Sequence, residues 1–274
     1  MTQAIATLAR RPDLTAIDNL FNLAGKRVFM PGGYGALGEA IAWGFARRGA
    51  HVAIAGPNQD SGARLAASIA ASGGSATSYV LDARDTDAIT SITDEVADFL
   101  GGIDVLVNCV GIQKEQKLLD VTPQTFDDVY ETNLRSAMFL SQSVARHQIK
   151  TGHGDGRHIH LLSVRSQLAL RDRGYSAYCA TKGALVMLVK QHAMELAPHG
   201  ITVNGVAPTF IRSERIRPHL EREKFHDFIL ERNPLGRIGE PVEVVGQVLA
   251  LAAPAGSYIT GQVVYIDGGV TASQ

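Results

Sequence analysis

The sequence predicts one α/β domain built on a doubly wound parallel sheet, and three observations predict it. Short apolar runs alternate with amphipathic segments along most of the chain. No internal repeat and no low-complexity linker interrupts this alternation, which is typical of a parallel sheet covered by helices on both faces. The 274 residues are also enough for a single domain of this kind with a full core.

The first half of the chain gives three strand–helix pairs. The run RVFMPG at residues 27–32 predicts the first strand. The helix expected over residues 37–49 has apolar residues at helical spacing and ends at Gly49, a typical helix C-terminus. The next elements follow in the same order, with strands at residues 51–56 and within 76–85 and helices at 61–74 and 86–102.

The second half continues the alternation. The apolar run at residues 103–111 predicts a buried strand, and Thr122 and Pro123 mark the start of one long helix over residues 122–149. The remaining elements are a strand at residues 157–163, a helix at 175–200 and strands at 201–208 and 261–269. About seven strands with right-handed crossovers give a Rossmann-type sheet. We expect this domain to span residues 23–274, preceded by an N-terminal arm at residues 1–22 that packs on the domain or on a neighbouring subunit.

Composition excludes several classes of function. The formal net charge is −1 and no long basic run occurs, so we expect no nucleic-acid partner. No apolar run approaches the roughly 20 residues of a membrane span, and the first residues do not resemble a signal peptide. The two cysteines, Cys109 and Cys179, cannot build a disulfide framework, which indicates a reducing compartment such as the cytoplasm. His158 and His160 share a strand face without a third ligand nearby, so we expect no metal site.

The glycine-rich stretch GGYGALG at residues 32–38 lies after the first strand and opens the first helix. At such a position the helix N-terminus and free backbone N–H groups attract a pyrophosphate, and glycines allow the backbone to approach it. The stretch fits GxGxxG starting at Gly33, or TGxxxGxG with Pro31 in place of Thr and Ala36 in place of the middle glycine. In this strand–turn–helix context both patterns predict nucleotide binding.

A tyrosine and a lysine four residues apart, Tyr178 and Lys182, share one face of an expected helix. A neighbouring ammonium stabilises phenolate and lowers the pKa of the phenol from about 10. Such a tyrosine exchanges a proton with an alcohol or a carbonyl near neutral pH. The pair alone is weak, but Ser163 ends a strand at the edge where open α/β sheets bind their ligands.

This ordered set of motifs resembles the short-chain dehydrogenase/reductase family over nearly the whole chain, from Leu23 to Gly269. The motifs are the glycine-rich stretch, NCVG after the fourth strand, TNL in the long helix, the serine at a strand end and YCATK. The resemblance implies a catalytic tetrad, which is Ser163, Tyr178, Lys182 and Asn133.

The resemblance also implies a role for each member of the tetrad. Tyr178 would be the general acid and base, and Lys182 would lower the pKa of that phenol and hold the nicotinamide ribose. Ser163 would orient the substrate oxygen. Asn133 would position a water molecule in a proton relay.

The same resemblance implies which residues hold a nicotinamide cofactor. They are Gly32, Gly33, Tyr34, Gly35, Leu37, Gly38, Asp82, Ala83, Asn108, Gly111, Tyr178, Lys182, Pro208, Ile211 and Ser213. The chain departs from the family pattern in the glycine-rich stretch, where we expect Gly35 to supply the flexibility that Ala36 lacks. Thr209 also stands where the family usually has glycine.

The spacing of 15 residues between Ser163 and Tyr178 is longer than is usual in the family. The extra length falls in LALRDRG at residues 168–174, a loop that can bulge without moving the serine. Ser166 is the alternative serine.

The end of the second strand leaves the choice between NAD and NADP open. Gly56 and Pro57 stand where an acidic residue would bind the ribose of NAD, or an arginine the 2′-phosphate of NADP. A phosphate without a protein partner costs more free energy than a ribose hydroxyl without one, because water can still bind the hydroxyl. The stretch PGGYGALG has no cation for the phosphate, which favours NAD. Arg64 on the following helix is the residue that could reverse this preference.

Two arginine-rich stretches and two short motifs bear on the substrate. The stretches SVRSQLALRDRG and FIRSERIRPHLERE are rich in arginine, which either lies solvated in loops or pairs with a carboxylate or phosphate. The candidate substrate residues are Gln113, Arg165 and Arg212. GIQKEQ and GYSAYCATKGAL resemble gluconate 5-dehydrogenase-like members of the family, which implies a sugar acid, polyol or related hydroxy acid. The alternatives are a 3-oxoacyl thioester reductase and a cofactor-binding protein with little catalysis.

The two longest expected helices, at residues 122–149 and 176–197, carry apolar residues on more than one face. In relatives a four-helix contact between subunits buries such surplus. We therefore expect a homotetramer.

Overall fold

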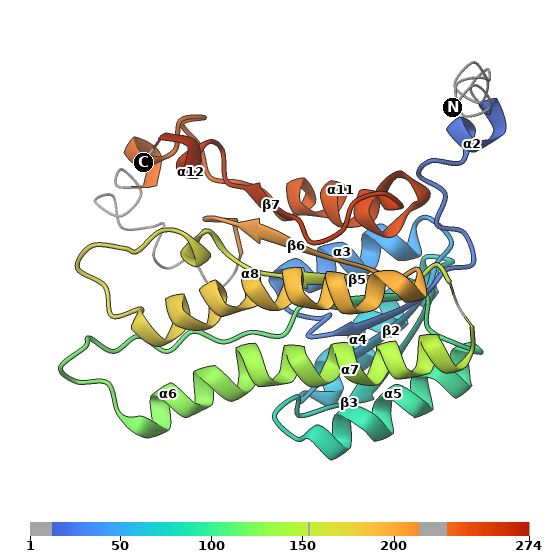
Figure 1. Ribbon diagram of the computed structural model, residues 1–274, viewed down its shortest axis with the longest axis horizontal. Coiled ribbons are helices and arrows are strands. Elements are labelled where there is room, and N and C mark those ends of the chain that lie inside the picture. Colours follow the sequence, from blue (N-terminus) through green and yellow to red (C-terminus); the bar gives the residue numbers. More distant parts are fainter. Residues whose placement is uncertain (1–12, 153, 214–228, 274) are drawn as a thin grey trace, which may run out of the picture.

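Seven parallel strands form the centre of the computed structural model, which describes residues 13–152, 154–213 and 229–273 (Figure 1). The strands are β1 (Arg27–Pro31), β2 (His51–Gly56), β3 (Ser75–Val80), β4 (Val105–Asn108), β5 (Arg157–Leu161), β6 (Thr202–Pro208) and β7 (Val263–Ile266). Their order in the sheet is β3-β2-β1-β4-β5-β6-β7. The winding direction reverses between β1 and β4, so a ligand crevice is expected at the carboxyl ends of these two strands. The predicted doubly wound sheet is confirmed.

Helices cover both faces of this sheet. They are α3 (Ala36–Ala46), α4 (Gln59–Ala71), α5 (Thr86–Leu100), α6 (Pro123–Tyr130), α7 (Ser136–Lys150), α8 (Ser176–Leu196) and α11 (Pro241–Ala252). Two short helices, α2 (Leu14–Asp18) and α12 (Val270–Ser273), lie near the ends of the chain (Figure 1). Helix α3 packs against α4 and α11, whereas α7 packs against α5 and α8 (Figure 1). None of the helices in the described ranges is both long and apolar enough to span a membrane.

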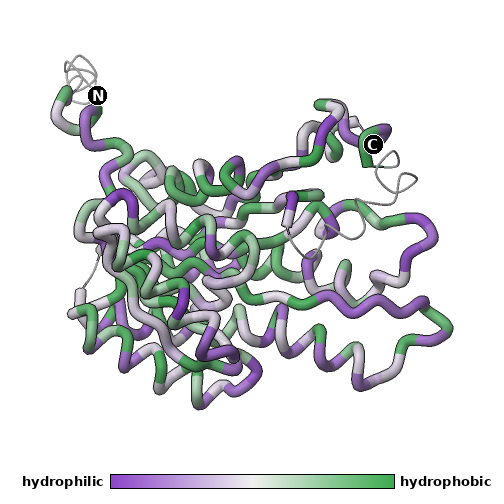
Figure 2. Tube along the Cα trace, turned by 180° about the vertical axis from the view of Figure 1, so that it is seen from behind, coloured by the Kyte–Doolittle hydropathy of each residue, from purple (hydrophilic) through white to green (hydrophobic). Residues whose placement is uncertain are grey.

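The two core layers follow from the alternation of side chains along each strand. On β1, Val28 and Met30 join the core under α3, and Phe29 between them joins the core under α5 and α7. All three side chains are fully buried. Figure 2 shows the hydrophobic segments running through the middle of the molecule. A parallel sheet buried on both faces needs such continuous apolar runs, which is why the strands could be recognised in the sequence.

The long helix expected over residues 122–149 is interrupted. Thr122 caps α6 as expected, since its side chain accepts a hydrogen bond from the Thr125 N–H at 3.2 Å. A π-helical turn, η2 (Glu131–Arg135), then separates α6 from α7. Such turns are frequent at functional sites, and this one holds the buried Asn133.

Helix α11 was not among the helices expected from the sequence. Its start carries a capping box between Glu240 and Glu243 and a proline, Pro241, in the first turn. The signal was therefore present in the sequence between the last two strands. The helix closes the layer that covers β5 and β6 beside α3.

The segment that precedes β1 projects from the domain (Figure 1). Residues 13–22 are exposed, including Leu14 and Ile17 of α2 and Phe21 in the turn after it, and Leu23 is buried. One backbone hydrogen bond, from the Ala255 N–H to the Leu20 carbonyl at 2.9 Å, ties this segment to the domain.

Candidate active site

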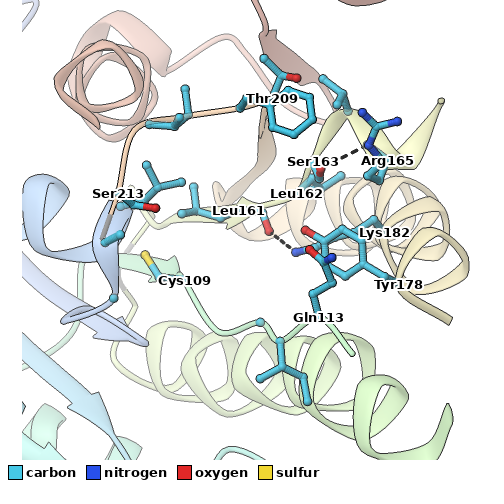
Figure 3. A pocket seen from close by; sticks show the side chains of 18 of the residues that line it. Cys109, Gln113, Leu161, Leu162, Ser163, Arg165, Tyr178, Lys182, Thr209 and Ser213 are labelled. Atoms are coloured by element: carbon cyan, nitrogen blue, oxygen red, sulfur yellow. Dashed lines mark hydrogen bonds between the residues drawn. The ribbon is translucent and has the colours of Figure 1, made fainter. Parts of the chain in front are cut away.

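A cavity opens at the carboxyl ends of the central strands (Figure 3). Its wall is formed by the glycine-rich stretch that opens α3, the turn after β4, the end of β5, the start of α8 and the segment after β6. Ser163, Tyr178 and Lys182 all line it. The cavity therefore lies where the reversal of strand order predicts a ligand site.

The tyrosine–lysine pair occupies the first two turns of α8, as predicted. Lys182 is buried, and its Nζ lies 5.7 Å from the centre of the Tyr178 ring. The same nitrogen donates a hydrogen bond to the carbonyl oxygen of Leu161 at 2.8 Å (Figure 3). Burial lowers the pKa of Lys182 to about 8. The sheet thus holds a desolvated amine next to the tyrosine ring, where its charge acts in a poorly solvated environment.

The serine predicted at the end of β5 caps the short 3₁₀ turn η3 (Val164–Ser166). The Oγ of Ser163 accepts a hydrogen bond from the Arg165 N–H at 3.2 Å and faces the cavity (Figure 3). The alternative, Ser166, instead contacts the hydroxyl of Tyr265 at 3.0 Å. This geometry favours Ser163 as the serine of the site.

The long spacing between Ser163 and Tyr178 is taken up by a loop that is fastened to the segment after β4. Arg173 pairs with Glu115, with 2.7 Å between Nε and Oε1. A Cβ on Gly174 would lie 2.2 Å from the backbone carbon of Gln116, so only glycine fits this contact. The loop therefore bulges outward across the cavity rim and leaves the serine in place.

Asn133 is buried next to the cavity but does not line it. Its Oδ1 accepts a hydrogen bond from the Ile112 N–H at 2.7 Å, and its Nδ2 donates to the Ile112 carbonyl at 2.9 Å. The same Nδ2 lies 3.2 Å from the Thr181 hydroxyl. The side chain thus fastens the cavity wall between the turn after β4 and α8.

Asn108, a predicted cofactor residue, also acts from behind the wall. Its Oδ1 accepts a hydrogen bond from the Val110 N–H at 3.0 Å, so its Nδ2 faces the Nδ1 of His160 at 3.3 Å. Because an amide Nδ2 only donates, His160 Nδ1 accepts, and its proton is on Nε2, 3.1 Å from the Ser141 hydroxyl. Burial keeps the pKa of His160 well below its usual value, which preserves this neutral form.

The glycine-rich stretch forms a narrow cradle. Gly32 has φ +76°, and a Cβ there would lie 2.6 Å from the backbone carbon of Cys109. A Cβ on Gly38 would lie 2.6 Å from the Gly32 carbonyl oxygen. Gly35 is extended, with φ −68°, and it is not crowded. The expectation that Gly35 supplies the flexible position is therefore wrong, because Gly32 supplies it and Ala36 is exposed without strain.

A dinucleotide fits this cradle. Side chains cap the starts of α4, α5 and α6, but α3 has no side-chain cap. Within the described ranges no acceptor pairs with the N–H groups of residues 36–38. Free N–H groups at a helix start are the partners that a pyrophosphate needs. At the opposite wall the buried Oγ1 of Thr209 also lacks a partner within those ranges, so a ligand amide could bind there.

At the end of β2, Tyr34 explains why the acidic residue is missing. A Cβ on Gly56 would lie 2.5 Å from the Tyr34 hydroxyl oxygen. That oxygen accepts a hydrogen bond from the Asn58 N–H at 2.6 Å. A phenol therefore occupies the space of a carboxylate. Further along the same edge Asp82 pairs with Arg84 at 2.6 Å, outside the cavity lining.

The structure separates the three candidate substrate residues. Gln113 and Arg165 line the cavity. Arg212 does not, and its Nε lies 2.7 Å from Glu240. Nine of the predicted cofactor residues line the cavity, and they are Gly32, Gly35, Leu37, Gly38, Gly111, Tyr178, Lys182, Ile211 and Ser213. Gly33, Ala83 and Pro208 are buried outside the lining. Arg215 and Arg217 of the arginine-rich stretch lie outside the described residues.

Several residues of the lining were not predicted. They are largely apolar and include Val110, Leu170, Tyr175 and Phe210. Their positions beside predicted site residues were the available signal. The sequence could not show which of them face the cavity.

A doubly wound sheet with a tyrosine–lysine pair beside a dinucleotide cradle defines a nicotinamide-dependent oxidoreductase. A family model described as enoyl-(acyl carrier protein) reductase matches residues 34–271. Gluconate 5-dehydrogenase of Gluconobacter oxydans is 36% identical over 255 residues, which cover 93% of this chain and 98% of that protein. A 3-oxoacyl-[acyl-carrier-protein] reductase of Thermotoga maritima is also 36% identical over 255 residues, which cover 90% and 98%.

Solved structures agree with these matches. The crystal structure of a gluconate 5-dehydrogenase from Burkholderia cenocepacia in complex with NADP and tartrate has a TM-score of 0.88 and 34% identity, and covers 93% of this chain and 99% of that chain. The chain belongs to the short-chain dehydrogenase/reductase family and is an NAD(P)-dependent oxidoreductase.

Proposed function

We propose that the protein interconverts a secondary alcohol and a ketone on a sugar acid, polyol or related hydroxy acid. The observation that carries this proposal is the buried Lys182 amine beside the Tyr178 ring, in one cavity with Ser163. The likeness to gluconate 5-dehydrogenases supports the substrate class.

The reaction follows from the positions of these side chains. The substrate oxygen would lie between the hydroxyl groups of Ser163 and Tyr178, and the nicotinamide, when bound, would exchange a hydride with the carbon that carries this oxygen. During oxidation Tyr178 takes the proton of the alcohol as a phenolate, which the charge of Lys182 stabilises. Ser163 orients the oxygen. Asn133, which fastens Ile112, would position a water molecule that carries the proton onward.

A substrate panel tests this function. We expect the purified protein to oxidise D-gluconate with NAD or NADP and to reduce 5-keto-D-gluconate with NADH or NADPH. The absorbance of the reduced cofactor measures both rates. Reduction of an acetoacetyl thioester that is faster than reduction of 5-keto-D-gluconate would favour the 3-oxoacyl reductase alternative. Cofactor binding without turnover of any panel member would favour a cofactor-binding protein.

We further propose that the cofactor is NAD(H) rather than NADP(H). The hydroxyl oxygen of Tyr34, which covers Gly56, already accepts a hydrogen bond from the Asn58 N–H. The hydroxyl still has its own proton, which it can donate to a ribose hydroxyl. The 2′-phosphate of NADP needs a cation at this position. Arg64, the candidate named from the sequence, is exposed and contacts Ser61 at 3.2 Å.

Separate titrations of NADH and NADPH by fluorescence check this preference. We expect NADH to bind more tightly, because the Tyr34 site supplies a hydroxyl and no charge. Binding of NADPH that is tighter by tenfold or more would contradict the proposal. If Arg64→Ala then removed that preference, Arg64 would be the phosphate partner.

The assembly is proposed to be a homotetramer, with residues 1–22 as an arm beside the domain of residues 23–274, and the compartment the cytoplasm. Large apolar side chains on the helices of one sheet face support the assembly. They are exposed to about two fifths or more and include Phe126 (45%), Met138 (40%), Met187 (61%) and Met194 (61%). Helices α7 and α8, which carry three of them, run side by side on this face (Figure 1).

A further inference from the structure

The charged side chains that line the cavity are all basic. Within the described ranges they are Arg165, Arg173 and Lys182, and the lining contains no aspartate or glutamate. Two of these three charges already have partners. Arg173 is neutralised by Glu115 at the rim, and Lys182 donates to the Leu161 carbonyl as part of the catalytic pair.

Arg165 has a different environment. It is half-buried, and within the described ranges no carboxylate lies within 4.0 Å of its guanidinium. Burial lowers the pKa of Arg165. A partly desolvated guanidinium without a carboxylate partner is a strong attractor for an anion.

The hydrogen bonds of Arg165 leave one edge of its guanidinium available. Nη1 donates to the carbonyl oxygens of Leu168 at 3.1 Å and Ala169 at 2.9 Å, which fixes the plane of the group. Nε and Nη2 have no acceptor within the described ranges. These two N–H groups form a parallel pair that matches the two oxygens of a carboxylate.

The position of this edge relates it to the reaction. Arg165 follows Ser163 by two residues, and its backbone N–H holds the Ser163 Oγ at 3.2 Å. Figure 3 shows the Arg165 side chain beside Ser163, at the end of the cavity away from Cys109 and Ser213. An acid group bound at this edge would belong to the same substrate molecule whose carbon reacts beside Ser163.

We propose that Arg165 binds the carboxylate of the substrate through Nε and Nη2, and so selects hydroxy acids over neutral polyols of the same length. This inference rests on the proposed function, since it assigns one end of the proposed substrate to one residue. The bulged loop of residues 168–174 takes part in this site, because its first two carbonyl groups hold the guanidinium.

The test compares two substrates of equal length that differ in the acid group, D-gluconate and D-glucitol. In Arg165→Gln, kcat/KM for D-gluconate is expected to fall by about 30-fold or more, since one partner of a desolvated charge pair is removed. The value for D-glucitol should change by less than about threefold, because the alcohol retains all its contacts. Arg165→Lys should be intermediate, since it keeps the charge and loses the paired donors.

Arg171→Gln is the matched control, because Arg171 lies exposed in the same loop and outside the cavity lining. This substitution should leave kcat/KM for both D-gluconate and D-glucitol unchanged. An Arg165→Gln variant that loses activity on both substrates equally, or on neither, overturns the inference. Circular dichroism of each variant shows whether it is folded. If Arg165→Gln does not fold, the two substrates are compared in Arg165→Lys instead.

A binding measurement separates this inference from the proposed function. Tartrate has two carboxylates and no ketone that NADH could reduce, so it should bind the complex with NADH without reacting. We expect calorimetry to detect tartrate binding to the wild type and at least 30-fold weaker binding to Arg165→Gln. If no sugar acid is turned over but this loss is seen, the proposed function fails and the carboxylate site stands. If tartrate binds both proteins equally, or neither, the carboxylate site fails whatever the enzyme oxidises.

Discussion

Phenylalanine in place of Tyr178 is expected to reduce turnover by about 10²- to 10⁴-fold, the usual contribution of general acid–base catalysis. The substitution removes the phenol oxygen and keeps the ring that packs over Lys182. Cofactor affinity should stay within a few-fold of the wild type, because the glycine cradle is unchanged. Initial rates in both directions, together with fluorescence titration of the reduced cofactor, measure the two effects separately.

Tyr175→Phe is the matched control for this prediction. Tyr175 also lines the cavity, and its ring centre lies 6.2 Å from that of Tyr178. Its hydroxyl accepts a hydrogen bond from Arg173 at 3.1 Å, so it belongs to the fastened rim. We expect less than a tenfold loss from this change. More than a tenth of wild-type turnover in Tyr178→Phe would remove the tyrosine from its proposed role.

The sheet could be predicted from the sequence because its central strands, such as β1, β2 and β4, are local apolar runs with clear ends. The glycines that make close backbone contacts in the first loop, Gly32, Gly33 and Gly38, also left a local signal. Which glycine takes a positive φ did not follow from the motif. The lack of room for a side chain at Gly32 also did not follow from it, because Cys109, at the end of another strand, packs against Gly32 only in the assembled sheet.

Charged residues show the same limit more sharply. The arginines of the stretches after β5 and β6 look alike in the sequence, which predicted an anion site and named Arg165 and Arg212 as candidates without distinguishing between them. Partners that are distant in sequence distinguish these arginines, because Arg173 forms an ion pair with Glu115 and Arg212 forms one with Glu240. Arg165 is left with one bound and one open edge. The candidate site was therefore predictable as a set of residues, and the function of each charge was not.

Lys182→Met is expected to slow alcohol oxidation and to move the rise of its rate to higher pH. Without the cation beside the ring, the phenolate of Tyr178 is less stable, so a higher pH is needed to form it. The ribose of the cofactor also loses a donor, and cofactor binding should weaken. A pH–rate profile measured at saturating cofactor checks the first effect. An unchanged profile with activity preserved would exclude this role for Lys182.

The same substitution is expected to stabilise the folded protein at pH 7. Burial lowers the pKa of Lys182 from 10.5 to about 8, so between these values the unfolded chain binds more protons than the folded one. The free energy of unfolding of the wild type therefore rises with pH through this window, whereas Lys182→Met lacks this contribution. Below pH 8 the full cost of burying the ammonium is present, and the advantage of the methionine variant is largest there, although the Leu161 carbonyl loses its donor.

Urea unfolding of both proteins at pH 7 and near pH 10 tests this expectation. The stability difference between variant and wild type should be positive at pH 7 and should shrink as the pH rises. Lys190→Met, which changes an exposed lysine on the same helix, should show no such trend. A Lys182→Met protein that is less stable than the wild type at pH 7 would mean that the Leu161 hydrogen bond outweighs the cost of burying the charge. If the prediction holds, the protein gives up stability at this position to keep a cation where the reaction needs it.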